Sequence, residues 1–230
     1  MDAADYLAHL RRESSAFGEC LRGDLTAAVP HCGGWTLYDL ADHLGRGNLW
    51  ATFAVTEKRG DHEAPAAPRD PAALATWFTG TSSVLLEALD TDPSGSAWTI
   101  FPPPTVGFWQ RRRCQEALVH RWDAENALGI GGRLDPALAD DGVAEVIDTM
   151  APRQFQLGRA RAPRYAVRFA ATDTRSSRVL GPGEPQATVS ATAADLLLLL
   201  WGRLSPDDPA VSWDGDFLRA RALLEAALVP

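Results

Sequence analysis

The residues most able to do chemistry lie in the stretch CQEALVHRWDAENALG, residues 114–129. Glu116 and His120 are four positions apart, a spacing that places both side chains on one face of a helix. An imidazole nitrogen and a carboxylate oxygen are both ligands of Zn²⁺, so this pair could bind one divalent ion from a single helix. The alternative is a solvated helix face, because a Glu–His pair at this spacing arises readily by chance. Two ligands also make no tight site, and a third must come from another helix.

His43 is a candidate third ligand. It lies in the stretch LADHLG, in an apolar stripe that also contains Leu40 and Gly47. A lone imidazole in such a stripe needs a buried partner, which leaves two interpretations. His43 is either a core histidine bonded to a carbonyl, or it faces Glu116 and His120 across a helical bundle. Bundles build metal sites from inward ligands on facing helices, and two nitrogens with one carboxylate leave a tetrahedral position open, as in catalytic zinc sites.

Charged neighbours of this pair have two interpretations each. Asp123 follows Glu116 by seven residues and shares its helix face. It could orient a metal ligand through a hydrogen bond, or it could be an exposed partner of Arg121 or Arg113. The run RRR at 111–113 could attract an acidic substrate to the site, or it could be a solvated charge run.

The other histidines and the cysteines are weaker candidates. His31 and Cys32 precede two glycines in a predicted turn, without a second cysteine at zinc-finger spacing, so we expect no structural zinc knuckle there. His62 lies in a Pro-rich loop, and Cys114 is expected only to pack within its helix. The chain has 3 cysteines, an odd and widely spaced set that argues against a disulfide framework.

Composition indicates an ordinary globular protein and excludes several classes of function. The 230 residues are 46% hydrophobic and 23% charged, with a formal net charge of −8. An acidic chain is poorly suited to sequence-independent nucleic-acid binding, which needs a basic surface. No apolar segment reaches the roughly 18 residues of a spanning helix, and the N-terminus lacks a signal-peptide core. We therefore expect a cytoplasmic protein, a monomer or homodimer, that binds neither nucleic acid nor membrane.

The pattern of apolar residues changes along the chain. Helical periodicity dominates to about residue 150, and its length and order predict a four-helix bundle. The four expected helices cover residues 5–21, 35–55, 72–89 and 109–128. The rest of the chain alternates short β-branched segments with Gly/Pro turns and includes the apolar helix ADLLLLLWGRL, which predicts a small α/β domain. We place the boundary between a helical domain, 1–152, and this second domain, 153–230.

Two stretches taken together resemble a known family. WTLYDLADHLGRGNLW, followed further along the chain by GFWQRRRCQEALVHRWDAENALG, is similar to the mycothiol-dependent maleylpyruvate isomerase family. The C-terminal ATVSATAADLLLLLWGRLSPDDPAVSWDGD resembles the second domain of that family. The resemblance covers essentially the whole chain. It implies an α+β protein with an N-terminal DinB-like metal-binding four-helix bundle, followed by a small α/β domain of sterol-carrier-protein type.

The resemblance also implies a set of site residues and cofactors. His43, Glu116 and His120 would hold a divalent metal, with zinc as the expected ion, and mycothiol would be the thiol cosubstrate. Arg203, in LLWGR, becomes a candidate contact to the thiol or to an acidic substrate. A buried arginine is costly without an anionic partner, and a local ion pair with Asp207 is the alternative.

The expected function is therefore a metal- and mycothiol-dependent enzyme, either an isomerase or a thiol S-transferase. It would act on a small electrophilic or acidic substrate through a zinc-activated thiolate, with Asp123 and Arg203 in supporting catalytic roles. The alternative is a non-catalytic protein in which the metal braces the bundle and the C-terminal domain binds a small molecule or a lipid. A third interpretation, a docking bundle, fits less well because the motif is polar and inward.

Overall fold

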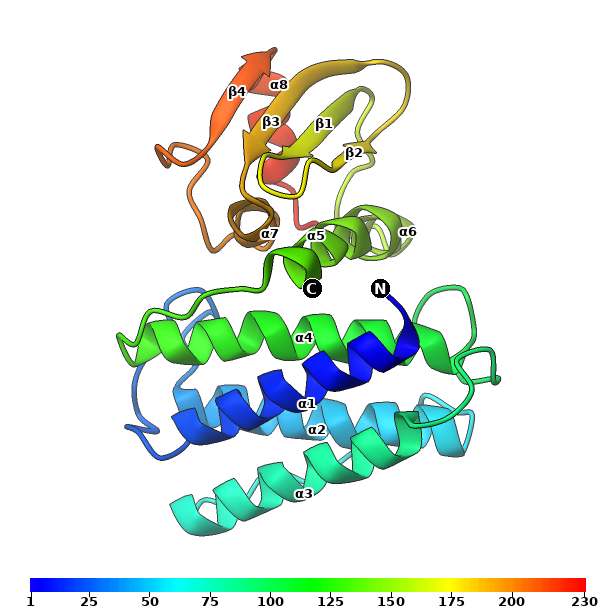
Figure 1. Ribbon diagram of the computed structural model, residues 1–230, viewed down its shortest axis with the longest axis vertical. Helices are drawn as coiled ribbons and strands as arrows, with labels where there is room; N and C mark the ends of the chain where they lie inside the picture. The colour runs from blue at the N-terminus through cyan, green and yellow to red at the C-terminus, as the bar shows by residue number, and fades with distance from the viewer. The chain divides into compact units, whose positions relative to one another are not determined.

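The computed structural model describes residues 1–230, which form two compact units, Met1–Arg133 and Leu134–Pro230. The first unit contains four helices, labelled in Figure 1: α1 (Ala3–Cys20), α2 (Leu37–Thr56), α3 (Pro71–Leu89) and α4 (Val106–Ala127). Helix α1 packs against α3 and α4, and α2 packs against the same two helices. The predicted four-helix bundle is thereby confirmed, with α1 and α2 on opposite sides of it.

Side-chain caps set where the bundle helices begin. Thr36 and Asp39 form a complete capping box at the start of α2, each side chain accepting from the backbone N–H of the other. Asp70 caps α3 ahead of a proline that cannot donate. Helix α4 begins at Val106, earlier than the expected residue 109, directly after the prolines at 102–104. Helix α4 is the exception to side-chain capping, since Thr105 makes no cap hydrogen bond.

The apolar core of the bundle follows the predicted helical stripes. Phe17 of α1 and Phe78 of α3 pack with their ring centroids 4.8 Å apart. Leu40 and Leu44 of α2 are fully buried beside them, together with Leu74 of α3. Burial of a side chain of this size contributes about 1.5–3 kcal/mol. This core holds α1, α2 and α3 together.

Helix α4 is buried although it has no apolar stripe. Its buried polar residues are Gln110, Arg112, Arg113, Gln115, His120, Arg121 and Asp123. Such groups are tolerated only when they are hydrogen-bonded or paired. Arg113 Nη2 donates to Leu44 O at 3.0 Å and to Asn48 Oδ1 at 2.8 Å, which ties α4 to α2. The predicted alternative of a solvated charge run at 111–113 is wrong for Arg113 and for Arg112, which is also buried.

A buried ion pair ties α4 to α1. Arg121 Nε donates to Glu13 Oε2 at 2.8 Å, and both side chains are less than a tenth exposed. The same guanidinium donates to Glu125 Oε2 at 2.5 Å and to Arg133 O at 2.9 Å. Arg121 is therefore committed to holding the bundle together and is not the partner of Asp123 that the sequence allowed.

The second unit combines a helical segment with a small sheet. The helical segment is α5 (Pro136–Glu145), a π-helical turn η1 (Val146–Met150) and α6 (Ala151–Gln156). The later elements are β1 (Ala166–Ala171), β2 (Ser177–Leu180), β3 (Pro185–Ala191), α7 (Ala193–Leu200), β4 (Ser212–Gly215) and α8 (Phe217–Leu224). The strand order is β2-β1-β3-β4, with β1 and β3 parallel and both outer pairs antiparallel. The predicted α/β domain is thus present.

The two units divide earlier than the sequence indicated. The expected boundary between residues 152 and 153 falls inside α6, whereas the compact units separate after Arg133. Helix α5 packs against α7, so it belongs with the sheet and not with the bundle. Helical periodicity alone could not reveal this, because it shows that a helix has an apolar face but not which partner covers it. No helix in the chain has both the length and the apolar character needed to cross a membrane.

Removal of the buried acid on α1 should destabilise the bundle. Glu13→Ala leaves the buried Arg121 guanidinium without one of its two carboxylates, so we expect the free energy of unfolding to fall by about 3 kcal/mol. The matched control is Glu19→Ala, since Glu19 is 61% exposed and pairs with Arg22 on the surface. Its cost should stay below about 1 kcal/mol. Urea unfolding measures both variants, and equal losses would contradict a special role for the buried pair.

Candidate metal centre

Two helices of the bundle supply the three predicted metal ligands. Glu116 and His120 lie one turn apart on α4, as their spacing required, and His43 lies in the middle of α2. His43 Nε2 and His120 Nε2 are each 3.2 Å from the same oxygen, Oε1 of Glu116. The two imidazole rings meet edge to face, with centroids 5.3 Å apart. One ligand atom from each residue lies within 4.8 Å of the others, which is a distance that one metal ion can span.

The three candidate ligands differ in how far their side chains are exposed to solvent. The side chain of His120 is 6% exposed, that of Glu116 15% and that of His43 42%. The alternative in which His43 is a core histidine bonded to a carbonyl is therefore wrong: its ring packs against Trp35 at 4.9 Å, and its side chain is partly open to solvent. Two nitrogens and one carboxylate with an accessible side match the donor set of catalytic zinc sites, which keep one position open.

Glu116 is kept ionised by its neighbours. Burial alone raises the pKa of this carboxyl, but the Arg112 guanidinium and the hydrogen bonds with His120 and His43 hold the pKa well below its ordinary value. Arg112 Nη2 contacts Oε2, so the second oxygen, Oε1, is the one that faces the imidazoles. A charged carboxylate with one oxygen already compensated is a ready metal ligand.

His120 is held from both sides of its ring. Burial lowers the pKa of this imidazole, but the carboxylates of Asp123 and Glu116 outweigh burial and raise it above its ordinary value. His120 Nδ1 donates to Asp123 Oδ2 at 3.0 Å, while Nε2 faces Glu116. A carboxylate on the second ring nitrogen is the usual partner of a metal-bound histidine, because it fixes the tautomer and the ring orientation.

Asp123 is buried and positions His120. Its side chain is fully buried, so the predicted alternative of an exposed acid is wrong. The sequence did offer the other interpretation, in which this residue orients a ligand through a hydrogen bond, and the contact with His120 Nδ1 has that geometry.

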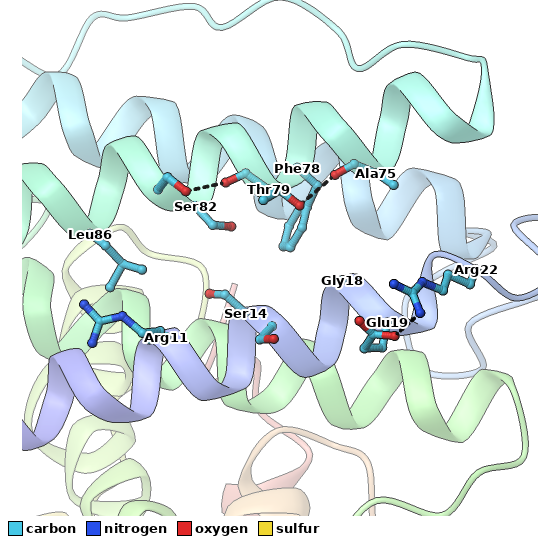
Figure 2. Close-up of a pocket in the computed structure, with 12 residues that line it drawn as sticks. Arg11, Ser14, Gly18, Glu19, Arg22, Ala75, Phe78, Thr79, Ser82 and Leu86 are labelled. Carbon is cyan, nitrogen blue, oxygen red and sulfur yellow. Dashed lines mark hydrogen bonds and ion pairs between the residues drawn. The ribbon is translucent and has the colours of Figure 1, made fainter.

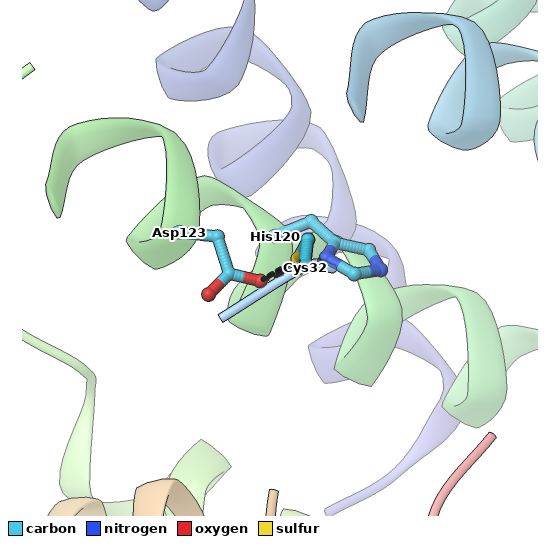
Figure 3. A group of neighbouring side chains, drawn as sticks. All are labelled: Cys32, His120 and Asp123. Carbon is cyan, nitrogen blue, oxygen red and sulfur yellow. Dashed lines mark hydrogen bonds and ion pairs between the residues drawn. The ribbon is translucent and has the colours of Figure 1, made fainter. Parts of the chain in front are cut away.

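Cys32 is a site residue that the sequence did not reveal. It lies between α1 and α2, in a turn where Gly33 and Gly34 adopt φ values of +54° and +87°, conformations that favour glycine. Cys32 Sγ donates to Asp123 Oδ2 at 3.6 Å, and Figure 3 shows the thiol beside Asp123 and His120. These three residues form a second group whose ligand atoms lie within 4.8 Å of one another. No sequence signal connects positions 91 apart in the chain.

The two groups share His120 but lie on opposite sides of its ring. His43 and Glu116 lie on the Nε2 side, and Cys32 and Asp123 lie on the Nδ1 side. The first group has an open side at His43. The second is more enclosed, since His120 and Asp123 are both buried. A catalytic ion suits the first group, and a closed structural ion would suit the second.

Arg203 belongs to the second compact unit. It follows α7, where Gly202 has a φ of +69°, and its Nη1 donates to Trp201 O at 2.8 Å. The guanidinium carbon also lies 5.4 Å from the centre of the Trp201 ring. Asp207, which the sequence offered as a local partner for Arg203, accepts from Arg221 at 2.8 and 3.0 Å.

Comparisons with known proteins agree with this architecture. A family model described as the mycothiol maleylpyruvate isomerase N-terminal domain matches residues 7–125, and one described as the MDMPI C-terminal domain matches residues 137–221. A crystal structure of the mycothiol-dependent maleylpyruvate isomerase matches with a TM-score of 0.68 at 16% identity, covering 94% of this chain and 95% of that one. A mutant of that isomerase matches with a TM-score of 0.70 at 15% identity and the same coverage. No match was found among curated proteins.

The two shifted pKa values predict how the stability of the metal-free protein depends on pH. The raised pKa of His120 contributes stability that is full below the ordinary value of 6.5 and is lost as pH rises through the folded-state pKa. The lowered pKa of Glu116 contributes stability that is present above its ordinary value of 4.5 and is lost as pH falls through the folded-state pKa. We therefore expect maximal stability between these limits.

Urea unfolding in the presence of a chelator, at a series of pH values, measures this profile. His120→Gln should flatten the decline above neutral pH, and Glu116→Gln should flatten the acid decline. His9→Gln, on α1 and outside the site, is the control and should leave both limbs intact. A profile unchanged by His120→Gln would contradict the pairing described above.

Proposed function

Because the chain belongs to the mycothiol maleylpyruvate isomerase family, we propose that it is a metal-dependent enzyme that uses mycothiol, as an isomerase or a thiol S-transferase. The observation that carries the proposal is the convergence of His43, Glu116 and His120, with ligand atoms within 4.8 Å of one another and one side open. The proposed cofactors are a divalent ion, with zinc expected, and the thiol. The proposed substrate is a small electrophile or acid.

The chain supplies the ligands and their support. His43 Nε2, Glu116 Oε1 and His120 Nε2 would hold the ion. When bound, zinc supplies Lewis acidity that lowers the pKa of a coordinated thiol, so that the thiol reacts as a thiolate. Asp123 keeps the Nδ1 proton of His120, so that Nε2 presents its lone pair to the ion. Arg112 neutralises the second oxygen of Glu116 and prevents it from competing as a base.

Either reaction class is chemically balanced with the same nucleophile. In isomerisation, thiolate sulfur adds to one carbon of an activated double bond, the resulting single bond rotates, and the sulfur leaves with its electron pair, so no atoms are gained or lost. In S-transfer, the sulfur displaces a leaving group, which departs with its electron pair, and the thioether is the product. Arg203, a residue of intermediate exposure, is proposed as a contact for an anionic group of the thiol or substrate.

Metal analysis of variants should show whether the ion binds to His43, Glu116 and His120 or to Cys32, His120 and Asp123. After expression without chelator, we expect about one equivalent of divalent metal per chain by mass spectrometry. His43→Ala should abolish this stoichiometry, Cys32→Ser should retain it, and Asp123→Asn should weaken affinity by about 10–100-fold. In the Co²⁺-substituted protein, we expect no intense near-ultraviolet thiolate band.

The opposite pattern would contradict a catalytic centre. Loss of metal in Cys32→Ser with retention in His43→Ala, together with a thiolate band, would place the ion in the enclosed group. That outcome would favour the non-catalytic alternative, in which a structural metal braces the bundle.

Turnover is a separate prediction. The metal-loaded protein, given mycothiol and a panel of electrophiles and cis-unsaturated acids, should form an S-conjugate or a geometric isomer that chromatography and mass spectrometry detect. Omission of the thiol, or the His43→Ala substitution, should reduce the rate by at least about 100-fold. Stoichiometric metal with no product from any panel member would count against an enzyme.

A further inference from the structure

A cavity of about 390 Å³ lies between α1 and α3, and none of its lining residues belongs to the candidate metal groups (Figure 2). The lining runs from Arg11 to Arg22 on α1 and from Ala75 to Leu86 on α3. On both helices it follows the spacing i, i+3, i+4, i+7, i+8 and i+11, which is one helix face. Two helix faces therefore line opposite walls of a cavity whose volume is within the roughly 300–1,000 Å³ of small-molecule sites.

The two faces carry hydroxyl groups instead of large apolar side chains. The serines and threonine of the lining are Ser14, Ser15, Thr79, Ser82 and Ser83. Small side chains can let two helices approach closely, but here they leave space between the helices. A Cβ added to Gly18 would come no nearer than 4.0 Å to the Phe78 ring. Close packing therefore does not require this glycine, and the small residues of both faces leave a cavity that larger side chains would fill.

The buried hydroxyl of Ser14 indicates that the cavity holds a polar molecule. Ser14 is 7% exposed, lines the cavity and makes no hydrogen bond within the chain. Buried polar groups in folded proteins are nearly always hydrogen-bonded, and Thr79 and Ser83 on the facing helix donate to carbonyls of their own helix. Since Ser14 has no such partner, only the contents of the cavity can satisfy its hydroxyl.

Ser82 supplies a second buried hydroxyl from the opposite wall. It is 8% exposed and accepts from Asn48 Nδ2 at 3.2 Å, so its own proton is available for a further bond. Figure 2 shows Ser14 on α1 and Ser82 on α3, the two helices that face each other. Because a hydroxyl both donates and accepts, two of them on opposite walls suit a molecule that carries several hydroxyl groups of its own.

Arg11 adds a positive charge at one end of the cavity. It is exposed and forms no ion pair within the chain. At the other end, Arg22 Nη1 pairs with Glu19 Oε2 at 2.8 Å, so the charge of that guanidinium is already compensated. A row of hydroxyls with one cation at its end is the arrangement expected for a hydroxylated ligand that ends in an anionic group.

We propose that the cavity between α1 and α3 binds a phosphorylated polyol, the class that includes the sugar phosphates. Arg11 contacts the phosphate, and Ser14 and Ser82 bond to the hydroxyl groups. A phosphate suits the arginine because its bonds to a guanidinium are charge-assisted and can be bidentate. An apolar molecule would leave both buried hydroxyls without partners. The lining shares no residue with the candidate metal groups, so this binding does not depend on the proposed function.

Calorimetric titration of the full chain with glucose 6-phosphate and with ribose 5-phosphate tests the proposal. Arg11→Gln should raise the Kd about tenfold, because one charge-assisted contact is lost. Ser14→Ala should raise it at least about threefold without lowering the free energy of unfolding, because its hydroxyl has no partner in the free protein. The matched control is Arg12→Gln, which removes the same charge at the next position of α1, outside the lining. It should change the Kd less than about twofold.

A cavity-filling variant tests the location of the site. Gly18→Leu should place its side chain in the cavity and abolish binding. The substitution also favours the helix, because glycine is a poor helix former, and urea unfolding checks that the variant is folded. Glucose and inorganic phosphate each carry half of the proposed chemistry, so each should bind at least about tenfold more weakly than glucose 6-phosphate. Binding should persist in His43→Ala, which separates this site from the candidate metal centre.

Several results would overturn the proposal. Failure of both sugar phosphates to bind the wild type at concentrations up to about 10 mM would do so, as would equal weakening by Arg11→Gln and Arg12→Gln. Retention of binding in Gly18→Leu, or its loss in His43→Ala, would place the sugar phosphate elsewhere. Inorganic phosphate that binds as tightly as glucose 6-phosphate would indicate a simple anion site. A dimer that dissociates in Gly18→Leu, without sugar-phosphate binding, would assign the cavity to contact with a second copy of the chain.

Discussion

The burial of a charged helix is the constraint on which the rest of the bundle depends. Helix α4 has no apolar face, yet most of its side chains are inside, so each buried ionic group must find a partner on a neighbouring element. Glu13 on α1 pairs with Arg121, and Asn48 and a carbonyl of α2 accept from Arg113. Because these partners lie on different helices, satisfying the polar groups of α4 also fixes how α1 and α2 are arranged around it.

The candidate metal centre is a local consequence of the same constraint. Glu116 is compensated by Arg112 at one oxygen, and its other oxygen has only imidazoles nearby, which are neutral unless protonated. The raised pKa of His120 favours a protonated imidazole, whose positive charge compensates the Glu116 carboxylate in the metal-free protein. A divalent ion between His120 Nε2 and Glu116 Oε1 would replace that proton with a larger positive charge. The same side chains can therefore bind a metal and also remain paired without one.

The similarity to solved structures supports the fold of this chain but does not identify its reaction. Identity of 15–16% over nearly the whole chain supports a common architecture, and reaction class depends on specific side chains within it. In this chain, those side chains divide into two neighbourhoods around His120 and a pocket beside His43. The loop between α2 and α3 supplies His62, Glu63 and Ala64 to the lining of that pocket.

The sequence by itself determined the four helices of the bundle, the strands of the second unit, and the face shared by Glu116, His120 and Asp123, because periodicity and capping act over a few residues. Together with the family resemblance, it also selected His43. Only the tertiary structure decided that His43 is partly exposed, that Arg112 and Arg113 are buried, that α5 belongs with the sheet, and that Cys32 lies beside Asp123. Each of these depends on which distant segment covers a given face. Local preferences do not encode that choice, which is set by packing and by the need to satisfy every buried charge.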